Sequence, residues 1–521
     1  MIDRTVPSCA LALAALVTAL ALTVTDDGSV PLPGWYLLDA ALFAVAVLLL
    51  RGVPGRRVAP LVLAGSAAVA AVGLLAPPRT SDDAYRYVWD GRVQAAGISP
   101  YAHTPDDPVL ARLRDPGLFP AGDGCTGWDE RRTTAGDCTR INRPAVHTVY
   151  PPVAQAWFAV VHPFGGGVRG MQAGGAVLAV ATTALLLRVG REQRRAALWG
   201  WFPGVAVWAV NDAHVDTLGA LLTVAGLGCA ARGRAVRGGL LLGGAVAAKL
   251  LPALVLPGAL SGLPAGRPSR KHVLLVGSAL GAFALSYLPY VVVSGTSVLG
   301  YLPGYLKEEG YEQGHIDRFG LLRLVLSDRL APWAAALVLA AVVVRVLRRG
   351  DRCRPWAGAL LVTGTALLLV SPTYPWYGLL VVALVALDGR WEWLAVPAAG
   401  QALYLTAGQE AQRLAYGTAL CVVLLVPLLR RYRVGRAAAV AGAGNRRTSD
   451  AMAADPGGAA AVPVEPPVPA DPDPLPSGWR TVSAGGCVAP AQGEEVPAVG
   501  GPPFRLDEPG TAGPPHGGPG P

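Results

Sequence analysis

Residues 273–293 read VLLVGSALGAFALSYLPYVVV, twenty-one residues without a single charge. An uncharged run of about 18 or more apolar residues is long enough to cross the hydrocarbon core of a bilayer as an α-helix. Similar apolar runs recur at residues 11–24, 40–50, 58–75, 331–344, 357–370 and 418–429. These runs lack the polar face that a surface helix of a soluble protein carries. The sequence therefore predicts an all-α, polytopic transmembrane helical bundle with about 11 to 13 spans.

The composition of the whole chain agrees with a membrane protein. Only 15% of the 521 residues are charged, whereas soluble globular proteins carry about a quarter. The net charge is +9, but the arginines gather in short clusters between the apolar runs and not on one basic face. Clusters of this kind set the orientation of membrane spans. We expect a multi-pass protein of the cell membrane, surrounded by lipid, with no nucleic-acid partner.

The charge distribution also predicts which loops lie outside the cell. With Arg4 in the cytoplasm, residues 78–150 form a long external loop, and long external loops are free to carry arginine because the bias applies to short ones. The remaining basic clusters then fall on the cytoplasmic side, at residues 51–57, 188–195, 267–271, 345–354 and 430–436. The active site would lie on the external face.

Two apolar runs do not fit as simple spans. Residues 153–161 are too few to span and follow the pair Pro151-Pro152, so we expect an external interfacial or re-entrant helix. Residues 240–260 are interrupted by Lys249 and Pro252. Here we expect a hairpin of two half-helices, with protein or water covering the backbone groups at the break.

The composition changes near residue 435. Residues 435–521 are rich in Ala, Gly and Pro and poor in aromatic side chains. A segment of this composition buries too little apolar surface to offset the entropy lost on ordering. We therefore expect a membrane domain at residues 1–434, followed by a disordered cytoplasmic tail at residues 435–521.

Two of the seven cysteines, Cys125 and Cys138, fall in the expected external loop. An oxidising compartment permits a disulfide between them. Two unpaired thiols are the alternative that the sequence leaves open.

The external loop begins with two adjacent carboxylates, Asp82 and Asp83. Acidic groups at the end of a span lose hydration, so a functional role is the default interpretation. Such a carboxylate could accept a proton from a hydroxyl group, and Arg86 nearby could pair with it or hold a phosphate. The alternative is a solvated helix N-cap, in which Ser81 or Asp82 satisfies free backbone amides.

A second polar group lies at the expected external start of a later span. It contains Asp212, His214 and Asp216, next to Asn211. Charged groups at this depth must face a cavity or a partner, so we expect a rim that faces the substrate. Carboxylates two residues to either side of the histidine do not share one helix face, which disfavours a compact metal site. An ordinary helix cap is the alternative.

Five more residues are candidates for binding substrate. Lys249 is the only charge in its apolar run, so it needs an anion such as a lipid-linked phosphate, or it extends to the interface. Arg318 could hold a phosphate and lies near His315, although an exposed loop salt bridge explains both residues equally well. Trp376 and Tyr377 could stack on sugar rings, or belong to the aromatic belt of a membrane protein.

Several of these motifs, in this order, resemble the GT-C superfamily of membrane glycosyltransferases. The closest likeness is to glycosyltransferase family 87, the polyprenyl-phosphate-mannose-dependent α-mannosyltransferases, and it covers roughly residues 1–436. The residues that carry it are Asp83 with Tyr87, Gly97, Pro100-Tyr101, Tyr150-Pro151-Pro152, the segment 211–216, Lys249 with Pro252, and Pro375-Trp376-Tyr377. The insertion between Tyr101 and Tyr150 is longer than the family pattern leads us to expect.

The resemblance implies a reaction and roles for particular residues. An acidic residue of the first external loop would be the catalytic base, and the spacing to Tyr87 favours Asp83, with Asp82 as the alternative. Arg86, Tyr87 and Tyr150 would contribute to substrate binding. The expected activity moves a hexose, mannose in this family, from a polyprenyl phosphate to a hydroxyl of a glycolipid or cell-envelope glycan, with inversion.

The sequence holds neither a phosphate-binding loop motif nor a dinucleotide fingerprint. We expect no cofactor, and a divalent metal lacks a supporting set of ligands. The main alternative function is a multi-span secondary transporter or lipid flippase, because broken helices and embedded charges occur in those proteins too. A transporter should place its charges near the membrane midplane, whereas the acidic groups here gather toward one side.

Overall fold

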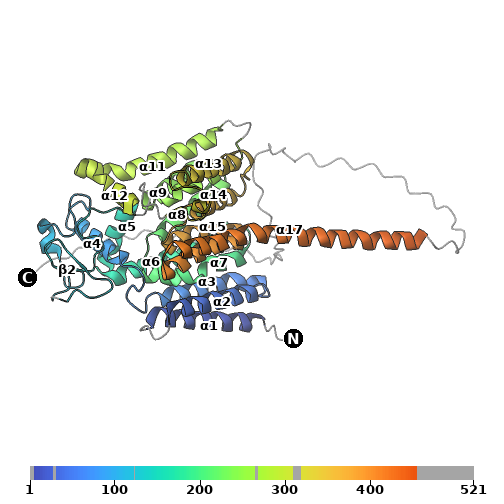
Figure 1. The fold of residues 1–521 in the computed structure, drawn as a ribbon, viewed down its shortest axis with the longest axis horizontal. Helices are drawn as coiled ribbons and strands as arrows, with labels where there is room; N and C mark the ends of the chain where they lie inside the picture. Colours follow the sequence, from blue (N-terminus) through green and yellow to red (C-terminus); the bar gives the residue numbers. More distant parts are fainter. Residues whose placement is uncertain (1–4, 27–30, 123, 264–267, 309–317, 454–521) are drawn as a thin grey trace, which may run out of the picture. The chain divides into compact units, whose positions relative to one another are not determined.

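The computed structural model describes residues 5–26, 31–122, 124–263, 268–308 and 318–453. Almost all of the regular structure in these residues is helical, as expected (Figure 1). The sheet found there has two antiparallel strands, β1 (Arg131–Arg132) and β2 (Cys138–Thr139). The α-helices are α1 (Thr5–Thr25), α2 (Leu32–Leu50), α3 (Gly55–Val72), α4 (Asp83–Ala95), α5 (Pro152–Val161), α6 (Val168–Val189), α7 (Ala197–Gly200), α8 (Asp216–Ala231), α9 (Ala235–Ala248), α10 (Leu256–Ala259), α11 (Arg270–Ser294), α12 (Leu302–Leu306), α13 (Ala331–Arg349), α14 (Pro355–Val370), α15 (Gly378–Asp388), α16 (Ala395–Thr406) and α17 (Gln409–Ala453).

The number of helices able to span a membrane is smaller than the 11 to 13 we expected. Seven helices in the described residues are long and apolar enough, namely α1, α2, α3, α6, α11, α13 and α17. An eighth span results if the bent pair Val205–Asn211 and Asp216–Ala231 is counted as one. Three further apolar segments, at Ala235–Ala248, Pro355–Val370 and Pro375–Asp388, have only 10 to 17 residues. The expected number counted such short and broken apolar segments as spans, whereas the count of seven or eight includes only helices of full length in the described residues.

The two apolar runs that did not fit as simple spans are short or interrupted in the structure. Helix α5 covers only ten residues after Pro151. Helix α9 ends at Ala248, Lys249 adopts an extended conformation, and a short 3-10 helix, η5 (Leu251–Val255), follows with Pro252 in its first turn. Proline suits the first turn of a helix because the amide it lacks would have no intrahelical acceptor there. Lys249 therefore lies at a break between two helical segments.

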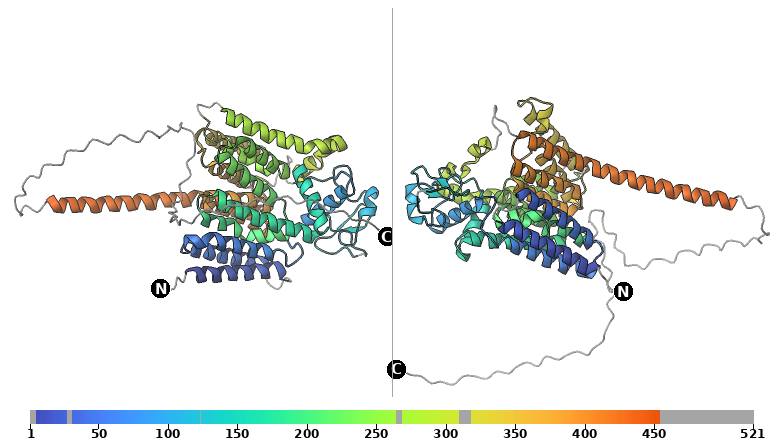
Figure 2. Two further views of the ribbon diagram at one scale, coloured as in Figure 1. Left: turned by 180° about the vertical axis from the view of Figure 1, so that it is seen from behind. Right: turned by 60° about the horizontal axis from the view of Figure 1, so that its bottom comes forward.

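The long helices lie alongside one another, and the loop segments collect at one end of them (Figure 1). Helix α4 and the β1–β2 hairpin lie at this end, whereas α17 extends beyond the bundle at the opposite end, as all views show (Figure 2). The structure continues α17 to Ala453, past residue 435 where we expected the tail to begin. Residues 454–521 of that expected tail lie outside the described part of the chain.

A separate apolar cluster fixes helix α4 at the loop end of the bundle. Tyr87 of α4 stacks on Phe158 of α5 with ring centroids 4.4 Å apart, and it meets Tyr150 edge-on at 4.9 Å. Trp89 and Ile141 are buried in the same cluster. Aromatic pairs at these distances add about 0.5–1.5 kcal/mol each beyond the area they bury. Asp83, the first residue of α4, therefore belongs to a helix that is firmly packed in place.

Small residues allow helices α9 and α11 to pack closely. Gly239 and Gly243 lie four residues apart on α9 and therefore on one face of the helix. A Cβ atom on Gly239 would overlap Ser278, and one on Gly243 would overlap the backbone of Ala279. This spacing of small residues is a common device for close packing of helices in membranes.

The contact predicts opposite effects for two glycine-to-alanine changes. Gly243→Ala should destabilise the protein by about 1–3 kcal/mol through overpacking against a backbone that cannot move aside. Gly281→Ala on α11 is the matched control, since a Cβ there meets nothing within 4 Å. The control should be neutral or slightly stabilising, because alanine favours a helix over glycine by about 1 kcal/mol. Thermal unfolding in detergent measures both, and equal shifts would contradict the close contact.

Candidate active site

A cavity of about 850 Å³ opens between the loop segments and the helix ends. Its polar lining includes Asp82, Asp83, Arg131, Asn142, Arg143, His147 and Lys249. Its aromatic lining includes Trp128, Tyr150, Tyr301, Tyr305, Tyr374, Trp376, Tyr377 and Tyr404. Six leucines, Leu32, Leu250, Leu251, Leu302, Leu306 and Leu405, complete much of the apolar wall. The cavity therefore offers surface to an ionic group and to a hydrocarbon chain together.

The two adjacent carboxylates both reach this cavity, but their surroundings differ. Asp82 pairs with Arg131 at 2.9 Å. Asn142 donates from its side-chain amide to Asp83 at 2.6 Å and to Asp82 at 3.2 Å. Burial raises the pKa of Asp82, and the negative charge of Asp83 raises it further. Asp82 is thus the carboxylate neutralised by an arginine, and Asp83 is the one held by an amide.

A buried histidine lies next to Asp83. The Nδ1 atom of His214 is 3.5 Å from a carboxylate oxygen of Asp83. Its ring stacks on Trp376 with centroids 3.9 Å apart. Within the described residues, neither ring nitrogen of His214 has a hydrogen-bond partner. Two unsatisfied nitrogens are costly at a buried position. His214, like Asp216, is not among the residues that line the cavity.

Asn211 and Asp212 hold the chain that leads into the two carboxylates. The side-chain amide of Asn211 donates to three backbone carbonyls, those of Gly73, Ala76 and Pro77. One carboxylate oxygen of Asp212 accepts the backbone amides of residues 79, 80 and 81 at 3.1–3.2 Å. Asp212 is fully buried and is not among the residues that line the cavity. Its position is that of an anchor and not of a substrate-facing rim.

The anchor depends on an unusual helix. Residues Val205–Asn211 form a π-helix, η4, in which the amide of Asp212 donates to the carbonyl of Val207, five residues earlier. Ala213, the next residue, has a positive φ of 55°, which a non-glycine residue adopts only at an energetic cost. π-Helical turns and strained backbone are frequent at functional sites. Here they turn Asp212 and His214 toward the loop.

The lysine at the break between α9 and η5 faces the same cavity. Its ammonium group is 3.0 Å from a carboxylate oxygen of Asp216, and 18% of its side chain is exposed. The ammonium group also lies 5.6 Å from the ring centroid of Tyr150 and 5.4 Å from that of Tyr377. Cations over aromatic faces at these distances are attracted to the rings. These contacts hold the ammonium group of Lys249 in place, and Asp216 neutralises part of its charge. The group is still accessible to an anion in the cavity.

Of the other candidates from the sequence, some lie at the cavity and others do not. Arg86 touches the cavity, but its guanidinium group pairs with Asp90 at 3.0 Å and donates to the carbonyl of Val146. Tyr87 is buried behind the cavity wall. Arg318 is buried, donates to Thr373 and is not among the lining residues. His315 lies outside the described residues.

Several lining residues were not candidates from the sequence. Arg131, Asn142, Arg143 and His147 belong to the long insertion, and nothing in their spacing distinguishes them from ordinary loop residues. Tyr305 donates to or accepts from Tyr377 through the two hydroxyl groups. The only sequence feature that could have indicated Tyr305 is the excess of aromatic residues near the ends of several apolar runs.

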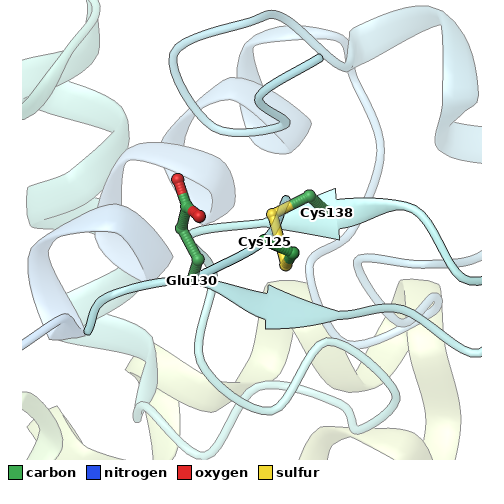
Figure 3. A group of neighbouring side chains, drawn as sticks. All are labelled: Cys125, Glu130 and Cys138. Carbon is green, nitrogen blue, oxygen red and sulfur yellow. A yellow bond between two sulfur atoms is a disulfide. The ribbon is translucent and has the colours of Figure 1, made fainter. Parts of the chain in front are cut away.

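The insertion is closed by the disulfide that the sequence permitted. Cys125 and Cys138 are bonded, with Cα atoms 5.4 Å apart, and the bond joins strand β2 to the segment before β1 (Figure 3). Glu130 lies near the two sulfur atoms. The proximity of two cysteines and a carboxylate resembles a metal site, but sulfur atoms bonded to each other supply no thiolate ligands. The bond between the sulfurs accounts for this group without a metal.

The fold and the cavity define a multi-pass helical membrane protein with an acidic, aromatic site at one end of its bundle. Residues 148–372 match the model of glycosyltransferase family 87. The match confirms the resemblance noted in the sequence over these residues, which include Tyr150, the segment 211–216 and Lys249. No curated protein and no solved structure matches the chain.

The Lys249–Asp216 pair predicts a strong coupling in stability. Asp216→Asn leaves a partly buried ammonium group without its carboxylate, and Lys249→Gln leaves a buried carboxylate without its cation, so each change should be clearly destabilising. The double variant should lose less stability than the two single variants lose together, with a coupling free energy of about 1–3 kcal/mol. The measurement is thermal unfolding of all four proteins.

The control for this cycle is the Arg323–Asp328 pair, which is close at 2.6 Å but whose carboxylate is 49% exposed. Exposed pairs contribute roughly 0–1 kcal/mol. The effects of Arg323→Gln and Asp328→Asn on the free energy of unfolding should therefore be additive. Additive effects at Lys249 and Asp216 as well would rule out the buried pair.

Proposed function

We propose that the protein is a membrane-embedded hexosyltransferase that moves a sugar, mannose, from a polyprenyl phosphate to a hydroxyl of a glycolipid or cell-envelope glycan. The observation that carries this proposal is the presence of Asp83 and Lys249 in one cavity that also has an apolar wall. A carboxylate can accept the acceptor's proton, a lysine can hold a phosphate, and leucine side chains can accommodate a polyprenyl chain. The family match adds the expectation of glycosyl transfer.

Asp83 is the base in this proposal. Its carboxylate is held by Asn142 and faces His214, whereas the Asp82 carboxylate is engaged by Arg131. Asp83 would take the proton of the acceptor hydroxyl while the hydroxyl oxygen attacks the anomeric carbon. The bond between that carbon and the phosphate oxygen breaks, and the polyprenyl phosphate leaves with both electrons. Attack from the face opposite the leaving group inverts the anomeric carbon.

Lys249 would hold the departing phosphate. Its ammonium group is oriented by Asp216 and by the faces of Tyr150 and Tyr377. A pre-oriented cation stabilises negative charge as it develops, without reorganisation during the reaction. The external orientation of the cavity is part of this proposal and follows from the distribution of basic clusters in the sequence.

Removal of the base should abolish most turnover. Purified protein in lipid is incubated with labelled polyprenyl-phosphate-mannose and glycolipid acceptors. Asp83→Asn should lower kcat by about 10²–10⁴-fold, because general base catalysis contributes an effect of that size. The control Asp82→Asn should retain much more activity, since its carboxylate is already neutralised by Arg131. Full turnover by Asp83→Asn would remove Asp83 from the mechanism, and transport of a solute without a transfer product would favour a transporter.

Removal of the lysine should affect the donor selectively. Lys249→Gln should raise the donor KM by about 10–100-fold, the equivalent of one charge-assisted hydrogen bond to phosphate. Lys271→Gln at the start of α11, outside the cavity lining, is the control. The acceptor KM should not change in either variant. An unchanged donor KM in Lys249→Gln would show that the phosphate binds elsewhere.

A further inference from the structure

The long insertion places one exposed indole at the cavity. Trp128 is 55% exposed and is among the residues that line the cavity. It lies in the turn that precedes strand β1, on the segment that the Cys125–Cys138 disulfide ties to strand β2. Large aromatic side chains that stay exposed in a defined cavity commonly serve to bind a ligand.

The backbone under this indole is held rigidly. The amide of Gly127 donates to the Glu130 carboxylate at 3.0 Å, and the Glu130 amide donates to the Gly127 carbonyl at 3.0 Å. Arg140 pairs with Asp129 at 3.3 Å. These contacts close the turn on both sides of Trp128 and leave its side chain as the projecting group. A rigid aromatic platform loses little conformational entropy when it binds.

The same turn is connected to the two carboxylates. Arg131 donates to the carbonyl of Trp128 at 2.8 Å and pairs with Asp82 at 2.9 Å. Asn142 then joins Asp82 to Asp83. From Asp83 the contacts continue in the other direction, to His214 and from there to Trp376. In this order of contacts Asp83 comes between Trp128 and Trp376, and Trp376 is followed in the chain by Tyr377, whose ring lies 5.4 Å from the ammonium group of Lys249.

We propose that Trp128 forms a sugar-binding subsite for the acceptor, and that the acceptor is a glycan with at least two sugar rings. This inference rests on the proposed function. The base must lie between donor and acceptor, and Lys249 with the adjacent lining residues Leu250 and Leu251 offers a cation and apolar surface suited to the lipid phosphate. The side that carries Trp128 is then left for the acceptor. The ring that presents the hydroxyl lies at Asp83, and a neighbouring ring stacks on the indole.

The test compares acceptors of two lengths. Labelled polyprenyl-phosphate-mannose is the donor, and octyl mannoside and octyl mannotrioside are the acceptors. Wild type should use the trisaccharide with a kcat/KM about tenfold above that for the monosaccharide, since one aromatic stacking contact corresponds to such a factor. Trp128→Ala should reduce this ratio to about one, with an unchanged donor KM. Trp128→Phe should keep most of the preference.

The control variant is Trp333→Ala on helix α13, where the indole is also exposed and lies outside the cavity lining. It should leave the ratio unchanged. An unchanged ratio in Trp128→Ala, with transfer intact, would overturn the subsite while leaving the proposed function in place. That is also the result expected if the indole only anchors the loop at the lipid surface. Failure of wild type to transfer to either acceptor would overturn the proposed function itself, and the subsite with it.

Discussion

A backbone that passes from a membrane span into a loop must satisfy its amide and carbonyl groups without help from water. Asn211 and Asp212 meet this requirement for the segment that follows helix α3, because their side chains take up three carbonyls and three amides of residues 73–81. The positions of Asp82 and Asp83 depend on that contact. So does the distance between Asp83 and His214, because His214 follows Asp212 by two residues. One polar pair thus fixes the two carboxylates and the buried histidine next to Asp83.

The sequence predicted local structure well at positions where the residues present have few structural explanations. An isolated lysine with a proline three residues later predicted a helix break, and the break is present at Lys249. Two cysteines in one loop permitted a disulfide but left two unpaired thiols open, and the structure contains the bond. The expected 11 to 13 spans and the seven or eight full-length helices of the described residues differ, because apolar runs in a sequence do not distinguish a full span from a short or bent apolar helix. Arg131 and Asn142 could not have been found, since their partners lie 49 and 60 residues away in the chain.

The family match and the cavity support the proposed reaction from different parts of the chain. The matched residues, 148–372, contain Lys249, to which we assign the phosphate, and two buried residues next to the site, Asp216 beside Lys249 and His214 beside Asp83. Asp83 and Trp128 precede the matched residues, and Trp376 follows them. The groups assigned to the donor therefore lie mostly within the family segment. The proposed base and the acceptor platform come from the preceding loop, whose long insertion gives this chain a surface of its own.

The π-helix at Val205–Asn211 has a consequence for how the chain tolerates change in length. A wide helical turn accommodates one residue more than an α-helical turn does. In a regular α-helix one added residue rotates everything that follows by about 100° around the axis, whereas the wide turn at Val205–Asn211 already takes up such a residue. A further insertion there would turn Asp212 away from residues 79–81, although no side chain of the cavity had been altered. This segment should therefore tolerate substitutions among apolar residues far better than a further insertion.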